Sequence, residues 1–182
     1  RDCKSFSWAG LWRFRNKTIS VPADVPSLSE AFEEIAHLAS LPKPIAAVSK
    51  ISLGAGDHYL PMAGLMAKRW RRLEVSDISG ITVSGVPPAL TSRAETLPRH
   101  LETTIVGQVS LNRSSSRYLF EDLCFKNDTS TAFTVHCNST VEIRRCLITK
   151  CGKNAIEASS GANIVVSDTS IHGCNTNESL TL

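Results

Sequence analysis

The C-terminal third of this chain repeats itself every 23 residues. Three eight-residue segments align at this offset, and each is apolar at its first, third, sixth and eighth places apart from Thr169. The segments are Tyr118–Phe125, Val141–Ile148 and Ile164–Ile171. A fixed period of this length is typical of one structural unit stacked on copies of itself. Because the alternation inside each unit is that of a strand, the repeat predicts a coil of short parallel strands, a β-solenoid.

Stacking at this period places equivalent residues above one another, about 4.8 Å apart. Each coil then buries its apolar edge only by contact with its neighbours. Two inward columns are expected to be buried throughout: Phe120, Ile143 and Val166; and Phe125, Ile148 and Ile171. A third column holds Leu123, Cys146 and Thr169.

Composition agrees with a single soluble domain. The 182 residues are 42% hydrophobic and 20% charged, and the formal net charge of +3 permits an anionic partner without implying one. The absence of a long apolar run predicts no transmembrane segment. No nucleic-acid module matches, so nucleic acid is not an expected partner. We divide the chain into an irregular arm (1–20), an extended segment with a capping helix (21–48) and β-helix coils (49–182).

A short amphipathic helix is predicted before the coils. Val21–Pro26 is expected to be extended, because each proline disfavours helix in the residue before it. Ser27 and Glu30 then have the spacing of a capping box. Apolar residues recur at helical spacing on one face, and the helix is expected to end before Pro42. They are Leu28, Ala31, Phe32, Ile35 and Ala39.

The order of these features resembles the opening coils of right-handed parallel β-helices of the pectin-lyase-like superfamily. The resemblance spans about residues 21–174 and implies an all-β solenoid whose open N-terminal end is capped by a helix. It is carried by the capped helix and by five segments: Val21–Pro26, Ile51–Tyr59, Ile81–Gly85, Thr104–Gly107 and Asp122–Asn127. The superfamily includes lyases, hydrolases, esterases and non-enzymatic modules. The Gln-Asp-Thr motif of its pectin esterases and the Asn-Thr-Asp and Gly-His-Gly motifs of its polygalacturonases are absent.

One outward column is the only candidate for catalysis. Asp122, Arg145 and Asp168 share the 23-residue offset. A lyase that cleaves acidic polysaccharides could hold calcium with such carboxylates and remove a proton with the arginine. The other interpretation is a ladder of salt bridges at a strand corner. Calcium is expected only under the lyase alternative; otherwise we expect no cofactor and no metal.

The densest basic run is a candidate binding site. It comprises Lys68, Arg69, Trp70, Arg71 and Arg72. Its charge suits an acidic polysaccharide, and Trp70 could stack on a ring. The alternative is a solvated loop between coils.

Six cysteines leave the redox state open: Cys3, Cys124, Cys137, Cys146, Cys151 and Cys174. Stacked free thiols are favoured over disulfides, although Cys151 and Cys174 occupy one position in adjacent coils. Five Asn-x-Ser/Thr triplets favour a secreted or luminal protein over a cytoplasmic one.

The two ends of the coil differ in sequence. A helix is predicted to cap the N-terminal end, whereas nothing comparable follows Cys174. The last coil is therefore expected to expose an apolar cross-section that includes Val166, Ile171 and Leu180, and such patches usually mark an interface. The favoured function is a non-catalytic binding or assembly module that contacts a partner protein, further coils or an acidic glycan. The alternative is a carbohydrate-active enzyme that acts on an acidic polysaccharide.

Overall fold

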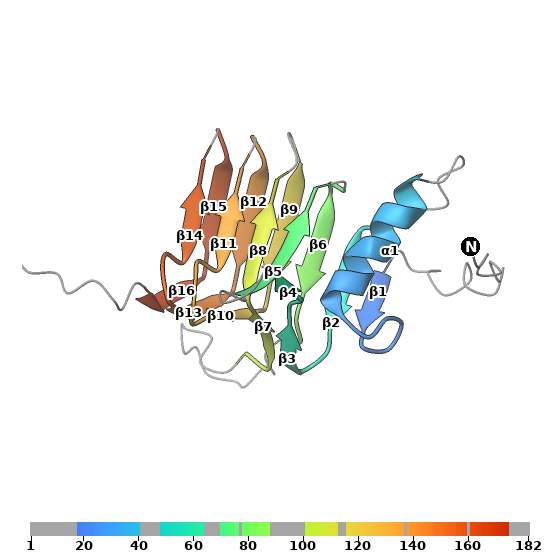
Figure 1. The fold of residues 1–182 in the computed structure, drawn as a ribbon. Helices are drawn as coiled ribbons and strands as arrows, with labels where there is room; N and C mark the ends of the chain where they lie inside the picture. Colours follow the sequence, from blue (N-terminus) through green and yellow to red (C-terminus); the bar gives the residue numbers. More distant parts are fainter. Residues whose placement is uncertain are drawn as a thin grey trace, which may run out of the picture.

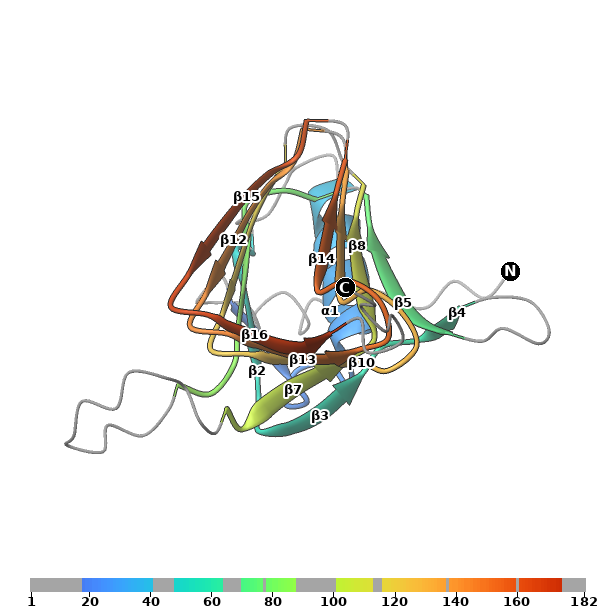
Figure 2. The ribbon, with the colours of Figure 1, turned by 90° about the vertical axis from the view of Figure 1, so that its left-hand side faces the viewer.

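The protein is a right-handed parallel β-helix with a helix at its N-terminal end, as seen in a computed structural model (Figure 1). The view along the coil axis shows three faces enclosing one core (Figure 2). Both the predicted fold class and the predicted solenoid are confirmed. The structure describes residues 18–40, 48–63, 70–76, 78–87, 101–112, 116–136, 138–159 and 161–174.

Three sheets form the faces of the coil in the described part of the chain. The first has six strands: β1 (Thr18–Val21), β2 (Lys50–Leu53), β6 (Ile81–Ser84), β9 (Arg117–Glu121), β12 (Thr140–Arg144) and β15 (Asn163–Ser167). The second has five: β3 (Gly56–Tyr59), β7 (Thr103–Val106), β10 (Cys124–Asn127), β13 (Leu147–Cys151) and β16 (Ser170–Cys174). The third also has five: β4 (Met62–Ala63), β5 (Trp70–Val75), β8 (Gln108–Leu111), β11 (Phe133–Val135) and β14 (Ile156–Ala158). Apart from the short antiparallel β4, neighbouring strands are parallel.

The strand register follows the 23-residue period. Val141 pairs with both Tyr118 and Ile164, and Ile148 pairs with both Phe125 and Ile171. Cys151 likewise pairs with Cys174. The columns predicted from the repeat are therefore the columns of the coil.

Aromatic rings fill the middle of the core. The side chains of Phe120, Phe125 and Phe133 are fully buried, and their ring centroids lie 4.5–5.9 Å apart. Ile143 and Ile148 in the next coil are also fully buried. These rings give the coil a rigid cross-section that each neighbouring coil has to match.

The burial predicted for the last members of these columns is wrong. Val166 is 43% exposed and Ile171 is 45% exposed, although both continue buried columns. They lie in the last described coil, where the side that would face a further coil has no described neighbour. An inward position is buried only when coils stand on both sides of it.

Helix α1 (Leu28–Ser40) covers the N-terminal end of the coil beside β1 and β2 (Figure 1). Its buried face is Leu28, Ala31, Phe32, Ile35 and Leu38. Ala39 was predicted on this face, but Ala39 is exposed and Leu38 is buried in its place. At the start of α1, the Glu30 backbone N–H donates to Ser27 Oγ at 3.3 Å, and the Ser27 hydroxyl donates to the Glu30 carboxylate at 3.1 Å. The predicted cap is thus present, and the Glu30 carboxylate accepts its hydrogen bond from the Ser27 hydroxyl.

The segment before α1 is a turn rather than the predicted extended stretch. The backbone N–H of Ser20 donates to Asp24 Oδ2 at 2.8 Å, and that of Asp24 donates to the Ser20 carbonyl at 2.7 Å. An aspartate that bonds the backbone nearby favours a turn. Strand β1 also begins at Thr18, within the predicted arm, and residues 1–17 of that arm lie outside the described residues.

Candidate functional site

Asp122, Arg145 and Asp168 meet at one corner of the coil, between the first and second sheets. Their backbones all have a left-handed conformation, with φ of 57°, 48° and 48°. Aspartate tolerates this region, whereas it is unusual for arginine. The repeat thus brings the three predicted residues together because the chain makes the same sharp turn in each coil.

An ion pair fixes Arg145 at this corner. Its Nε and Nη2 donate to the two carboxylate oxygens of Asp122 at 2.8 Å each, and Nη2 also donates to Glu121 at 3.1 Å. The Asp122 side chain is only 7% exposed. Hydrogen bonding to Asp122 raises the pKa of the Arg145 guanidinium above its usual range. Arg145 is consequently held in its protonated form, which is unsuited to removing a proton.

The third member of the column is not part of this pair. Asp168 is exposed, and within the described residues it forms no ion pair with Arg145. Lys50 approaches Glu121 at 3.9 Å on the other side. The corner is therefore a charge ladder running from Lys50 to Arg145. No group of three His, Cys, Asp or Glu side chains in the described part of the chain is arranged to hold a metal ion.

The described arginines of the basic run are bound by the protein itself. Arg71 lies over the ring of Tyr59, 4.7 Å from its centroid, and donates to the Leu60 carbonyl at 3.0 Å. Arg72 donates to Ser110 Oγ at 3.0 Å and forms an ion pair with Glu74 at 3.0 Å. These contacts occupy hydrogen-bond donors of both guanidinium groups, and Glu74 neutralises the charge of Arg72.

The rest of the basic run is not described at the level of its side chains. Lys68 and Arg69 lie outside the described residues, and Trp70 is described as the first residue of β5. Binding of an acidic ligand by the five-residue run stays a prediction.

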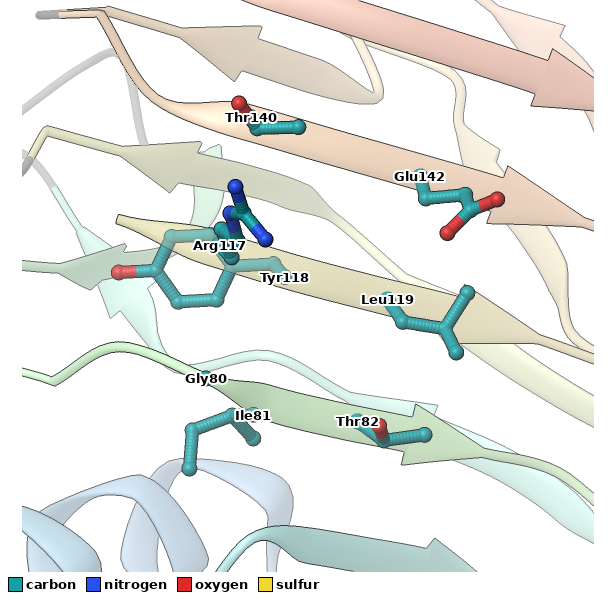
Figure 3. A pocket seen from close by; sticks show the side chains of 8 residues that line it. All are labelled: Gly80, Ile81, Thr82, Arg117, Tyr118, Leu119, Thr140 and Glu142. Atoms are coloured by element: carbon teal, nitrogen blue, oxygen red, sulfur yellow. The ribbon is translucent and has the colours of Figure 1, made fainter. Parts of the chain in front are cut away.

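A cavity of about 290 Å³ opens on the outer face of the first sheet (Figure 3). It is lined by β6, β9 and β12 and by the turn before β6. Its residues are Gly80, Ile81, Thr82, Arg117, Tyr118, Leu119, Thr140 and Glu142. This group of residues was not among the sites predicted from the sequence. The 23-residue period could have identified it, because side chains at alternate positions of each strand point outward. Arg117 and Thr140 are one period apart at such positions, and so are Leu119 and Glu142.

The four described cysteines, Cys124, Cys146, Cys151 and Cys174, are free thiols, as favoured from the sequence. Cys3 and Cys137 lie outside the described residues. Burial raises the pKa of Cys124, and it raises the pKa of Cys146 and of Cys151 to about 12. Such thiols are packing groups of the core and poor nucleophiles near neutral pH.

The open edge lies at the opposite end of the coil from α1. Val165 and Val166, neighbours in β15, are 44% and 43% exposed, and Ile171 in β16 is 45% exposed. Leu180, the third residue predicted for this surface, lies outside the described residues. The outermost strands of the three sheets here are β14, β15 and β16 (Figures 1 and 2).

No helix in the described part of the chain has the length and apolar character needed to cross a membrane. Comparison with protein-family models, with curated proteins and with solved structures finds no match. The fold and the geometry of these surfaces are therefore the grounds on which a function can be argued.

Proposed function

We propose that this chain is a non-catalytic β-helix module that assembles with a partner protein through the open edge of its last described coil. The observation that carries the proposal is the exposure of Val166 and Ile171. Their column neighbours Ile143 and Ile148 are fully buried. Water can solvate the free backbone groups of an edge, but it cannot satisfy apolar side chains.

Within the described residues, each of the three sheets ends on the same side of the molecule in an edge strand that pairs with one neighbour only. These strands, β14, β15 and β16, have three, five and five residues. A partner that adds parallel or antiparallel strands would pair the backbone groups and cover Val166 and Ile171 in one step. Unprotected edges of this kind otherwise invite uncontrolled pairing.

The other end of the coil supports the same proposal by contrast. Helix α1 buries Leu28, Phe32 and Ile35 beside β1 and β2, so the end of the first sheet is covered there. The end at β14, β15 and β16 differs in that Val166 and Ile171, which belong to inward columns, are exposed there.

A lyase that acts on an acidic polysaccharide is the alternative, and the charged corner supports it less well. Asp122 is taken up by Arg145, whose raised pKa makes it a poor base. Incubation with polygalacturonate and calcium tests this alternative. Formation of an unsaturated product, seen as a rise in ultraviolet absorbance, would contradict the non-catalytic proposal.

Two neighbouring valines provide a matched experiment for assembly. Val165 and Val166 are equally exposed, but Val165 points away from the coil and Val166 belongs to its inward column. Without another partner, the open edge is expected to pair with a second copy as the concentration rises. Sedimentation velocity should then show association for the unmodified chain and for Val165→Lys, and a monomer for Val166→Lys.

Circular dichroism of both variants serves as the folding control. A chain that stays monomeric at high concentration, or equal association of the two lysine variants, would overturn the proposal.

A further inference from the structure

Two cysteines lie opposite each other in the last two described coils. Cys151 ends β13 and Cys174 ends β16, strands that lie side by side in the second sheet (Figures 1 and 2). The two residues are register partners. Register partners in a sheet have Cα atoms about 4.8 Å apart, within the range of about 4.4–6.8 Å that disulfides span. Among the described cysteines, no other pair is in register.

The two thiols are also oriented alike. Each sulfur donates to the carbonyl oxygen two residues earlier in its own strand, Cys151 to Thr149 at 3.8 Å and Cys174 to His172 at 3.7 Å. Burial raises the pKa of Cys151 to about 12, and the hydrogen bond and charge of the Cys174 side chain add to this rise. The thiols therefore stack one above the other and influence each other directly.

Solvent reaches the two thiols unequally. Cys151 is only 1% exposed, whereas Cys174 in the last described coil is half-buried. A dissolved reagent therefore meets Cys174 first, and Cys151 reacts through its neighbour. Thiol–disulfide exchange requires this order of events, because one thiolate attacks the reagent and a second thiolate resolves the mixed disulfide.

The packing next to the two cysteines leaves β16 freer to move than β13. A Cβ on Gly152, which follows Cys151, would lie 2.4 Å from the Asp128 carbonyl oxygen, so this coil is packed tightly on the one before it. A Cβ on Gly173, which precedes Cys174, would meet no atom outside its chain neighbours closer than 3.7 Å. A cavity of about 260 Å³ also opens at this corner. It is lined by Asp128, Lys150, Cys151, Gly152 and Gly173. The end of β16 thus has room to approach β13, as a disulfide requires, because its Cβ atoms lie about 3.8 Å apart.

We propose that Cys151 and Cys174 form a site of reversible oxidation, at which a small disulfide compound converts the two thiols into a disulfide bond. The Cys174 thiolate attacks one sulfur of the compound, whose S–S bond breaks and releases a first small thiolate. The Cys151 thiolate then attacks Cys174 Sγ and displaces a second one. The two protons of the cysteine thiols end on the released thiolates. Two electrons pass from the protein to the compound, which is reduced to two thiols.

This bond ties the last described coil to its neighbour. It links β16 to β13 across one 23-residue period, and such a link restricts the unfolded chain. The oxidised chain is consequently the more stable form, and its last coil opens less often. The proposal concerns two coils of one chain, so it does not depend on assembly through the open edge.

Oxidation of the folded chain tests the site. The reduced chain is incubated with glutathione disulfide at a concentration where it is monomeric, the remaining thiols are alkylated, and the peptides are mapped by mass spectrometry. We expect a linked pair of peptides that contain Cys151 and Cys174, and its loss on addition of a dithiol. The midpoint of thermal unfolding should rise by at least about 5 °C on oxidation. In urea the same reagent should give mixed pairs, because only the fold holds these two thiols together.

Three serine variants separate the roles of the thiols. Cys174→Ser should abolish the link and leave Cys151 reduced, since the thiol that reacts first is gone. Cys151→Ser should stop the reaction at a mixed disulfide on Cys174. Cys124→Ser is the matched control, because Cys124 is buried in β10 with Thr104 and Leu147 as its register partners, and it should leave the link unchanged. Circular dichroism checks that each variant is folded.

Three results would overturn the proposal: no linked peptides from the folded chain, a mixed disulfide on Cys174 that Cys151 does not displace, or a link that forms equally often in urea. None of them bears on assembly, which is measured with the Val165 and Val166 variants.

Discussion

Ile148 and Ile171 allow the stacking of coils to be measured with one side chain in two environments. They occupy one column in adjacent coils, yet Ile148 is fully buried and Ile171 is 45% exposed. Substitution by alanine removes the same three carbons at each place. The difference between the two costs therefore reports what a second neighbouring coil contributes.

The expected magnitudes follow from burial. Three buried carbons contribute about 2.4 kcal/mol at about 0.8 kcal/mol each. Ile148→Ala also leaves a void beside Phe125, and the rigid ring stack prevents its collapse, so we expect a loss of about 3–4 kcal/mol. Ile171→Ala removes carbons that water already reaches on one side, and we expect a loss of about 1 kcal/mol.

Urea unfolding followed by circular dichroism, at a concentration where the chain is monomeric, measures both losses. An unchanged slope with urea would show that the two variants unfold to the same extent as the unmodified chain. If Ile171→Ala cost as much as Ile148→Ala, the last described coil would be covered in solution and the reasoning would be refuted.

Three further predictions concern the corner, the thiols and a coil contact. Asp122→Asn keeps a residue that tolerates the left-handed turn, so its loss of about 1 kcal/mol should isolate the ion pair with Arg145. Glu121→Gln loses a single hydrogen bond with Arg145 and the longer ion pair with Lys50, both at more exposed groups, and should cost less; equal unfolding midpoints of the two variants would contradict this. Burial raises the pKa of Cys146 and of Cys151 from 9.0 to about 12, so the thiols of the unfolded chain lose their protons at a lower pH than those of the folded chain. The free energy of unfolding should therefore fall as the pH rises above about 9, by up to about 1.4 kcal/mol per pH unit for each thiol. Urea titrations at about pH 8–10.5 measure this fall, and substitution of both cysteines by alanine should flatten it. Gly85→Ala would place a Cβ 2.2 Å from the Asp122 carbonyl oxygen, so the two coils must move apart. We expect a fall in stability of at least about 2 kcal/mol, measured by thermal unfolding. An unchanged unfolding midpoint would show that the coils at this corner are packed less tightly than in the structure.

The fold could be predicted from the sequence because the repeat carries both the strand pattern and the register. A column such as Phe125, Ile148 and Ile171 needs only the offset of 23 residues and the alternation of apolar side chains. The capping helix was predictable for a similar reason, since Ser27 and Glu30 mark its start locally. Ala39 and Leu38 exchanged roles because helical spacing alone does not fix which way the last turn faces the coil.

The sites were less predictable because they depend on which charges neutralise one another in space. The repeat aligned Asp122 with Arg145, but only the left-handed corner shows that the pair is bidentate and that Arg145 is held. The basic run was conspicuous in the sequence, yet Arg71 and Arg72 are bound by Tyr59 and Ser110 from distant strands. Arg117 is a single cation in the sequence. Only the structure shows that Glu142, on the neighbouring strand, is paired with Arg144 and leaves Arg117 as the unpaired charge of the cavity among the described residues.

Amide hydrogen exchange at low and high protein concentration tests assembly through the open edge most directly. Under dilute conditions, amides of β12 and β13 should be protected because each strand lies between two others. Those amides of β15 and β16 that point away from β12 and β13, toward the open edge, should exchange faster. At high concentration, protection should rise in β14, β15 and β16 and stay unchanged in α1. Unchanged exchange in these three strands, or new protection confined to α1, would contradict the account.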